Sequence, residues 1–446
     1  MNAREAALKA LQTLEPGKEK SDRIVHAILD RATMNRQDRA LTTELVNGVL
    51  RMRRKIDFII SKFYHHRFEK AAPVLQNILR LGVYQLLFLE KIPDWAAVSE
   101  CVHLARKYKG ERMAKLVNGV LRKITPEKVL LDEWLKACDD MERLSVQYSH
   151  PEWLIDRWSA VYGMEPTLVA MKYNNQAPLF GFRINTLKQT PDEFFADPVH
   201  SSFPQERCMT GNFFLSKEFS GFEACLKQGK LTVQNPTQGL ACLLLNPEPE
   251  SRVIDLCAAP GGKATFLAEL MQNRGSIIAV DRSNEKLEKT RQHAEALGIT
   301  IITTISADAR SFVPEKIAEA VLLDAPCTGT GVLQKRAELR WRLSVKMLQE
   351  LVTLQRELLD HAASILPVNG ILLYATCSIE PEENELQIEA FLRRHPEFSI
   401  DTSFGSLPEP FRMSVAQKGS ILTLPGEHPG FDGGFAQRLR KNALQA

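Results

Sequence analysis

Apolar residues in the first third of the chain recur with helical spacing, and strand-like alternation is almost absent there. The segment from Val74 to Ile92 is apolar on several sides and predicts a buried central helix that Pro93 stops. The heptapeptide LVNGVLR occurs at 45–51 and again at 116–122, and Asn-Gly inside a helical pattern indicates close helix packing or a break. We therefore expect residues 1–140 to form an all-α bundle of paired helices.

A different pattern begins near Tyr148. A His-Pro pair at 150–151 interrupts the helical pattern, and an aromatic-rich helix follows it. Residues 179–194 then alternate as a strand does and reach a helix start at Thr190, and residues 200–235 contain short phenylalanine-rich strands. The segment 148–235 is therefore expected to be a small α+β module.

From Pro236 to the end of the chain, apolar strands alternate with helical segments. The expected strands lie in residues 251–257, 276–281, 299–308, 319–327 and 370–378, and the expected helices in 263–271, 284–297, 344–366 and 382–394. Two later runs, 420–424 and 433–440, can add an antiparallel pair at the edge. Continuous apolar strands between helices favour an α/β fold with a doubly wound, Rossmann-like parallel sheet in residues 236–446.

Composition and charge narrow the class of protein. The 446 residues contain no apolar run long enough for a membrane span, the start lacks a signal peptide, and eight cysteines are scattered without a CxxC pair. We expect a cytoplasmic protein with reduced thiols and without a metal site or a membrane partner.

The net charge is unevenly distributed. Residues 1–150 contain 27 Lys and Arg against 19 Asp and Glu, whereas the rest contains 30 against 35. A basic front end indicates a polyanionic partner, although an ordinary solvated helical surface has the same composition. Basic residues cluster at 51–57 and at 105–115, and Lys and Arg at this density can neutralise RNA phosphates. The candidate RNA contacts in the first cluster are Arg51, Arg53, Arg54 and Lys55.

Polar residues follow the predicted strands where ligands bind in doubly wound sheets. Gly261 and Gly262 allow a ligand to approach the backbone, Asp281 can hold the hydroxyls of a ribose, and Asp308 can contact adenine. The loop is not GxGxxG, so a dinucleotide is disfavoured, whereas S-adenosylmethionine has no phosphate to cradle. A tight turn with capping carboxylates is the structural alternative. The candidate cofactor-binding residues are Cys257, Ala258, Ala259, Pro260, Gly261, Gly262, Lys263, Asp281, Asp308 and Asp324.

Two cysteines, Cys327 and Cys377, follow neighbouring strands over the same predicted cleft. Carbon 5 of cytosine is a poor nucleophile, but a thiolate that adds to carbon 6 makes it reactive toward a methyl donor. Asp324 is placed to hold N3 and the amino group of such a base. The chemistry alone leaves either thiol eligible as the nucleophile.

Three motifs, DLCAAPGGK, DAPCTGTG and YATCSIEPEENELQI, together resemble those of the RNA cytosine-C5 methyltransferase family. The helical front end is similar to the NusB RNA-binding fold, and the pairing resembles the small-subunit rRNA methyltransferases of that family. The resemblance implies S-adenosylmethionine as the methyl donor, Cys377 as the nucleophile, Cys327 as an aid to product release and Asp324 as a base contact. It also makes Arg183, in a family-like Arg-x-Asn signature, a candidate RNA contact. We therefore expect the module at 148–235 to bind RNA together with the helical residues 1–140.

The implied substrate is 16S rRNA, free or in a partly assembled small subunit, and we expect a monomer that does not act on DNA. Three alternatives remain at this point. They are a tRNA cytosine-C5 methyltransferase, a catalytically inactive NusB-like RNA-binding or transcription partner, and an NAD-dependent oxidoreductase on a similar sheet.

Overall fold

The computed structural model describes residues 1–14 and 20–443, and the chain forms two compact units. The first unit contains residues 1–176 and 333–342, and the second contains residues 177–332 and 343–446. The chain therefore passes between the units after residues 176, 332 and 342. The predicted boundary near residue 148 falls inside the first unit, and the three-part division of the chain stays a prediction.

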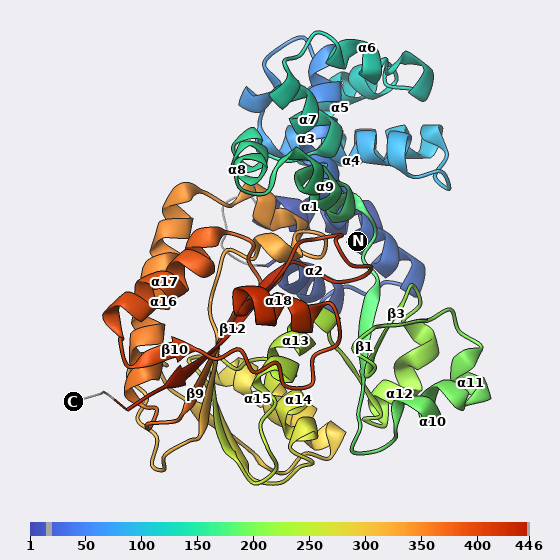
Figure 1. Ribbon diagram of the computed structural model, residues 1–446. Coiled ribbons are helices and arrows are strands. Elements are labelled where there is room, and N and C mark those ends of the chain that lie inside the picture. Colours follow the sequence, from blue (N-terminus) through green and yellow to red (C-terminus); the bar gives the residue numbers. More distant parts are fainter. Residues whose placement is uncertain (15–19, 444–446) are drawn as a thin grey trace. The chain divides into compact units, whose positions relative to one another are not determined.

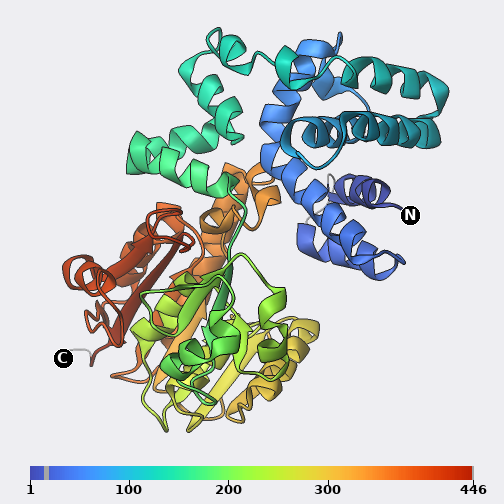
Figure 2. The ribbon, with the colours of Figure 1, turned by 90° about the vertical axis from the view of Figure 1, so that its right-hand side faces the viewer.

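The first unit is helical, and its described residues form no strand (Figure 2). Its helices are α1 (Ala3–Leu14), α2 (Ser21–Asp30), α3 (Arg36–Phe63), α4 (Pro73–Phe88), α5 (Asp94–Leu121), α6 (Leu131–Leu135), α7 (Asp140–Tyr148), α8 (Glu152–Tyr162) and α9 (Met164–Asn175). Three short 3₁₀ turns, Phe68–Lys70, Pro126–Lys128 and Ala337–Trp341, complete it. This confirms the expected all-α front end.

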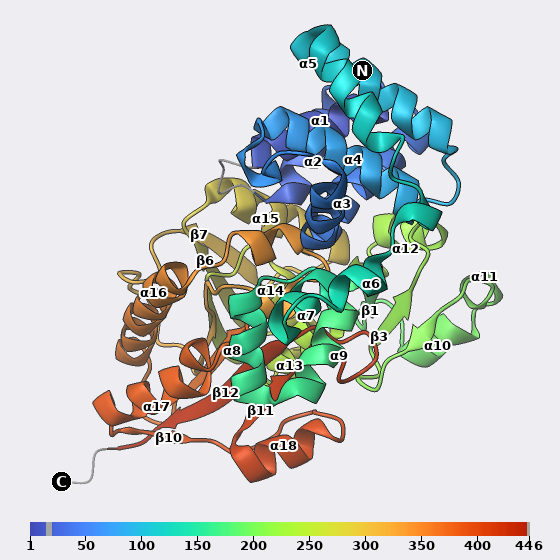
Figure 3. The ribbon, with the colours of Figure 1, turned by 90° about the horizontal axis from the view of Figure 1, so that it is seen from above.

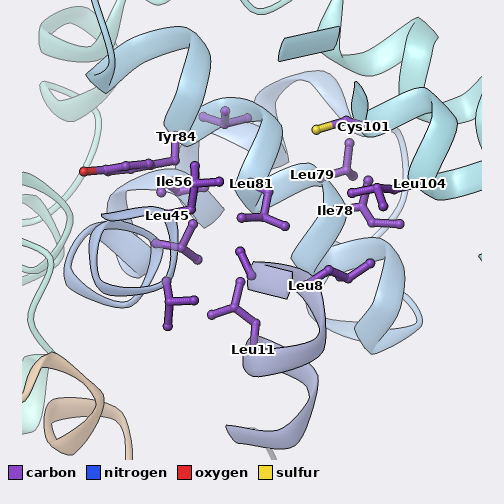
Figure 4. Packing of buried hydrophobic residues seen from close by; sticks show 14 of the residues in the cluster. Leu8, Leu11, Leu45, Ile56, Ile78, Leu79, Leu81, Tyr84, Cys101 and Leu104 are labelled. Atoms are coloured by element: carbon purple, nitrogen blue, oxygen red, sulfur yellow. The ribbon is translucent and has the colours of Figure 1, made fainter. Parts of the chain in front are cut away.

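Helix α4 is the central helix of this bundle, because every residue from Val74 to Leu86 is buried. Figure 4 shows side chains from α1, α3, α4 and α5 in one apolar cluster, among them Leu8, Leu45, Leu81 and Leu104. The first Asn-Gly pair marks close packing, since a Cβ on Gly48 would lie 1.9 Å from the Tyr84 ring. The second pair does not, since nothing lies within 4 Å of a Cβ built on Gly119.

Residues 333–342 belong to the first unit although their neighbours in sequence lie in the second. The fully buried Arg340 donates hydrogen bonds to four backbone carbonyls, those of Arg51, Ser149, Asn174 and Leu333. Trp341 Nε1 donates to the Leu50 carbonyl at 2.6 Å, and the buried Glu338 accepts from Ser21 Oγ at 2.9 Å. Helical residues far away in the sequence therefore fix this segment.

The second unit begins with a small antiparallel sheet of strand order β2-β3-β1-β4. Its strands are β1 (Phe180–Ile184), β2 (Glu206–Arg207), β3 (Phe213–Ser216) and β4 (Leu231–Val233), and its helices are α10 (Pro191–Ala196), α11 (Pro198–Ser201) and α12 (Glu223–Lys227). Thr190 caps α10 in a capping box with Glu193, so the predicted helix start is correct. Figure 3 shows α10, α11 and α12 beside β1 and β3, around a core of Phe182, Phe194, Phe214 and Phe222.

The remainder forms a large mixed sheet of order β10-β12-β9-β8-β5-β6-β7, with β11 paired to β12 (Figure 1). The strands are β5 (Arg252–Leu256), β6 (Ser276–Asp281), β7 (Ile302–Ser306), β8 (Ala320–Asp324), β9 (Ile371–Thr376), β10 (Phe398–Ile400), β11 (Ser420–Thr423) and β12 (Gly434–Lys441). Strands β5 to β9 are mutually parallel, and β12 is antiparallel to β9, β10 and β11. The chain order reverses on either side of β5, as in doubly wound sheets.

Helices cover both faces of this sheet. They are α13 (Pro236–Leu245), α14 (Gly262–Leu270), α15 (Asn284–Leu297), α16 (Val345–Ser364), α17 (Glu385–Arg394) and α18 (Phe411–Lys418). Neighbouring strand residues enter different cores: Val253 packs in the cluster that includes α13 to α15, and Ile254 packs in the cluster that includes α16 and α17. This confirms the α/β, Rossmann-like class, although the short strand β10 was not predicted. No helix in the described residues is long and apolar enough to cross a membrane.

Candidate active site

The parallel strands bring four of the predicted polar residues to one edge of the sheet. Asp281 and Asp324 are the last residues of β6 and β8, Asp308 lies two residues beyond β7, and Cys377 directly follows β9. The loop 257–261 joins β5 to α14 at the same edge. Gly261 has φ 94° there, and a Cβ would lie 2.5 Å from Thr290, so this turn requires glycine.

A pocket beyond β6 and β7 is lined by Cys257, Asp281, Asp308 and Pro326, among other residues. Asp281 Oδ1 accepts a hydrogen bond from the Ser283 amide at 2.8 Å, which leaves acceptor capacity on the carboxylate. Hydrogen bonds from Arg310 lower the pKa of Asp308 to about 2, so this carboxylate is ionised at neutral pH. Because two carboxylates meet in one pocket beside a glycine-containing loop, the residues fit the ribose hydroxyls and base of an adenosyl group.

Lys263 and Asp324 form an ion pair beside the thiols. Lys263 Nζ lies 2.6 Å from Asp324 Oδ2, and the lysine side chain is 11% exposed. Burial alone would lower the pKa of Lys263, but the charge of Asp324 and their hydrogen bond raise it, so the ammonium stays charged. Lys263, Cys377 and Thr376 line a common small cavity, so the lysine lies beside the thiol of Cys377.

The two candidate cysteines are in contact. Cys327 Sγ lies 3.3 Å from Cys377 Sγ, well beyond the roughly 2.05 Å of a disulfide bond. The hydrogen bond with Cys377, burial and the charge of Cys377 raise the pKa of Cys327 well above its usual value. Cys327 therefore holds its proton at neutral pH, and its sulfur lies in hydrogen-bonding contact with that of Cys377.

Arg183 does not lie where an RNA contact is expected, because its side chain is fully buried. Its guanidinium donates to Gln234, to the Gly262 carbonyl at 2.9 Å and to Thr265, and it pairs with Glu269 at 2.8 Å. This corrects the expectation, since a guanidinium with these partners cannot reach a phosphate. Arg183 instead joins β1 to both ends of α14, the helix that directly follows the candidate cofactor loop.

The first basic cluster also differs from expectation. Arg51 is buried and donates to the Gln334 carbonyl, and Arg54 pairs with Glu142 and Glu152. Arg53 lies over the Trp341 ring, and burial lowers the pKa of Lys55. Arg51 is therefore a structural residue, and the other three are half-buried, so this cluster offers little free charge to RNA.

The second basic cluster is more accessible. Lys109, Arg112 and Lys115 are exposed on α5 around Gly110, where the helix axis breaks at φ 79°. No ion pair is found for these three cations within the described part of the chain. The region 105–115 is therefore the better candidate for RNA contact in the first unit.

The buried carboxylates near this site that were not singled out from the sequence include Asp255, Glu269 and Glu383. Glu383 lies in the EPEENE run, where its acidic neighbours suggest a solvated turn. The described residues contain no group of three His, Cys, Asp or Glu side chains arranged to hold a metal ion.

Comparisons with known proteins agree with these features. Residues 242–440 match the family model "16S rRNA methyltransferase RsmB/F", residues 1–141 match the NusB family, and residues 150–197 match the ferredoxin-like domain of RsmF/B-like methyltransferases. The chain is 32% identical to the "probable ribosomal RNA small subunit methyltransferase B" of Bacillus subtilis, over 99% of each protein. It is 32% identical to the ribosomal RNA small subunit methyltransferase B of Shewanella oneidensis, over 91% of each.

Solved structures show the same architecture. The crystal structure of PH0851 covers 98% of both chains with a TM-score of 0.80 and 28% identity. A methyltransferase homolog protein from Pyrococcus horikoshii covers 68% of this chain and 99% of its own, with a TM-score of 0.57 and 25% identity.

Proposed function

Because this chain belongs to the family of the ribosomal RNA small subunit methyltransferases B, we propose that it methylates carbon 5 of a cytosine in 16S rRNA through a covalent bond to Cys377. S-adenosylmethionine is the methyl donor, and the residues at the β5, β6 and β7 ends would hold it. The contact between Cys327 and Cys377, beside the pair of Lys263 and Asp324, is the observation that carries this proposal.

In the first step the Cys377 thiolate adds to carbon 6 of the base, and the electron pair of the ring double bond becomes available at carbon 5. Asp324 would hold the amino and N3 side of the ring, and the Lys263 ammonium, 2.6 Å from that carboxylate, would stabilise the negative charge that develops there. When bound, S-adenosylmethionine supplies the methyl group that carbon 5 accepts.

Release of the product then requires loss of the proton on carbon 5. Its C–H electron pair restores the ring double bond, and the carbon 6–sulfur bond breaks with its pair remaining on Cys377. Cys327, 3.3 Å from Cys377, is the candidate base. It yields its own proton to solvent once Cys377 is a neutral thioether, and afterwards accepts the carbon 5 proton.

Transfer of a labelled methyl group to rRNA tests the activity, and two variants test the roles. C377S should abolish transfer, whereas C327S should accumulate a covalent protein–RNA species that denaturing electrophoresis resolves. An RNA carrying 5-fluorocytosine should be trapped on Cys377. Mapping of the trapped base to Cys327 would reverse the two roles, and methylation of the amino group or of adenine would overturn the proposal.

We infer that the first unit contributes RNA affinity through Lys109, Arg112 and Lys115. The variant K109A/R112A/K115A should weaken binding to all RNAs and reduce the slope of log affinity against log salt by about 2 to 3, from 0.7–0.9 per phosphate contact. Affinity for S-adenosylhomocysteine should not change.

A control of equal charge change removes three exposed cations of the second unit, in the variant R274A/K346A/K418A. Its salt slope should stay at the wild-type value. Equal slopes for the wild-type protein and the variant in α5 would contradict the assignment of these phosphate contacts.

The substrate is expected to be free or partly assembled rRNA, because a cytosine stacked in a helix must be extruded before a thiol can reach carbon 6. We propose that the enzyme acts as a monomer in the cytoplasm, and sedimentation at micromolar concentration tests the monomer. Bisulfite sequencing of rRNA and tRNA from cells without this gene should show one missing 5-methylcytosine in 16S rRNA. If the missing 5-methylcytosine were found only in tRNA, the substrate would be tRNA and the chemistry would be unchanged.

A further inference from the structure

A buried carboxylate, Glu383, contacts the loop of Cys327 without lining either pocket at the strand ends. Glu383 Oε1 accepts hydrogen bonds from the Thr328 amide and from Gln355 Nε2, both at 2.9 Å. Glu383 Oε2 accepts from the Thr328 hydroxyl at 2.5 Å. One carboxylate therefore binds both polar groups of the residue that follows Cys327.

The same glutamate is tied to the segment that carries Cys377. The Tyr374 hydroxyl, from β9, donates to the Glu383 carbonyl at 2.7 Å. Ser378 Oγ lies 3.1 Å from the hydroxyls of both Thr328 and Thr330. Glu383 thus belongs to a buried network that connects the loop of Cys327 to the strand of Cys377.

The network also reaches helix α16. Gln355 Nε2 donates at 2.9 Å both to Glu383 and to the carbonyl of Pro326, the residue before Cys327. The backbone is therefore held on both sides of Cys327, through Pro326 and Thr328, by groups that meet at Glu383.

A buried carboxylate is costly in free energy unless it is fully hydrogen-bonded, and burial raises the pKa of Glu383 despite these donors. An apolar residue would stabilise the core at lower cost but would leave the Thr328 amide without an acceptor. The acid therefore fixes geometry, and the geometry it fixes is that of the Cys327 loop.

We infer that Glu383 is a positioning residue that holds Cys327 against Cys377 and thereby sets the rate at which the methylated base is released. The inference rests on the proposed function, because it assigns Cys327 to the release step. Glu383 itself touches neither substrate nor cofactor, so its loss should act after the covalent bond has formed.

The test compares E383A, E383Q and T328V in the full-length protein. E383A removes the acceptor of the Thr328 amide and the Glu383 acceptor of its hydroxyl, so kcat should fall about 10- to 100-fold while KM for RNA stays within about twofold. The covalent protein–RNA species should accumulate, as in C327S. E383Q should recover most of the activity, because its amide oxygen can accept from the Thr328 amide while its NH₂ donates to the Thr328 hydroxyl. T328V removes only that hydroxyl and should show a smaller accumulation.

D401N is the matched control, because Asp401 is a buried carboxylate of the same unit that accepts from Arg440 at 2.8 Å on β12. It should lower thermal stability without accumulating the covalent species. If E383A behaves like D401N, or keeps wild-type kcat, the positioning role is overturned. If E383A does not fold, the test rests on T328V. Release of the methylated RNA by T328V at the wild-type rate would then overturn the inference. Absence of the covalent species in C327S would instead defeat the proposed role of Cys327, a separate failure.

Discussion

The substitution Arg183→Met removes one half of a buried ion pair and leaves Glu269 without its partner. Both side chains are 0% exposed, and the guanidinium also lies 4.8 Å from the centre of the Phe266 ring. Breaking a buried pair from one side costs about 3–5 kcal/mol. At about 2–4 °C per kcal/mol for a unit of this size, Tm of the second unit should fall by roughly 6–20 °C.

The loss of stability in R183M should depend on pH in a defined direction. Burial already raises the pKa of Glu269, and without Arg183 this pKa rises further above the unfolded value of about 4.3. An acid with a raised pKa in the folded state loses stability as pH rises through that pKa. The difference in unfolding free energy between the variant and the wild-type protein should therefore be smallest near pH 4 and grow toward pH 7.

Thermal and chemical unfolding of the wild-type protein, R183M, E269L and R183M/E269L measures this directly. The double variant should recover most of the lost stability, because replacing both partners by apolar residues leaves no uncompensated charge. Affinity for S-adenosylhomocysteine should fall in R183M, since Arg183 also holds the Gly262 carbonyl at 2.9 Å. A loss below about 1 kcal/mol at pH 7, or equal losses in single and double variants, would refute the reasoning.

Three further outcomes are expected. One equivalent of hydrogen peroxide should oxidise Cys327 and Cys377 to a disulfide, because their sulfurs lie 3.3 Å apart. The mass of the protein should then fall by about 2 Da, and dithiothreitol should restore the methyltransferase activity. Continued alkylation of these two thiols after the treatment would contradict the prediction. Burial lowers the pKa of His293 to about 4, so the unfolded state binds more protons below pH 6.5. Stability of the second unit should therefore fall by up to about 3 kcal/mol between pH 6.5 and 4 in denaturant titrations, and H293Q should flatten this dependence. R340M should destabilise the first unit by about 3 kcal/mol or more, since buried carbonyls lose their donor, and an unchanged urea midpoint would contradict it.

The sequence was sufficient to predict which edge of the sheet carries the candidate site residues. The strands are buried on both faces and read as apolar runs, so their ends, and with them Asp324 and Cys377, can be located from the pattern alone. The contact between Cys327 and Cys377 then follows, because β8 and β9 are parallel neighbours. Strand β10 could not be found in this way, since its three residues are too few for a periodic signal.

The arginine assignments failed for a physical reason. Residue type reports charge but not burial, and the partner that neutralises Arg183 lies 86 residues away at Glu269. Arg51 likewise meets Gln334, 283 residues further along the chain. Such pairs are set by tertiary packing, which neither periodicity nor charge density reveals.

The packing of residues 333–342 in the helical unit has a consequence for experiments that divide this protein. These residues pack on Ser21, Leu50 and Arg51, so a polypeptide lacking the front helices would lose the carbonyl acceptor of Trp341 and one of the four carbonyl acceptors of Arg340. The front helices therefore cannot be removed without disturbing the packing of residues 333–342. The activity of a truncated enzyme would reflect misfolding as well as lost RNA contacts. Point substitutions in the full-length chain can separate RNA binding from catalysis.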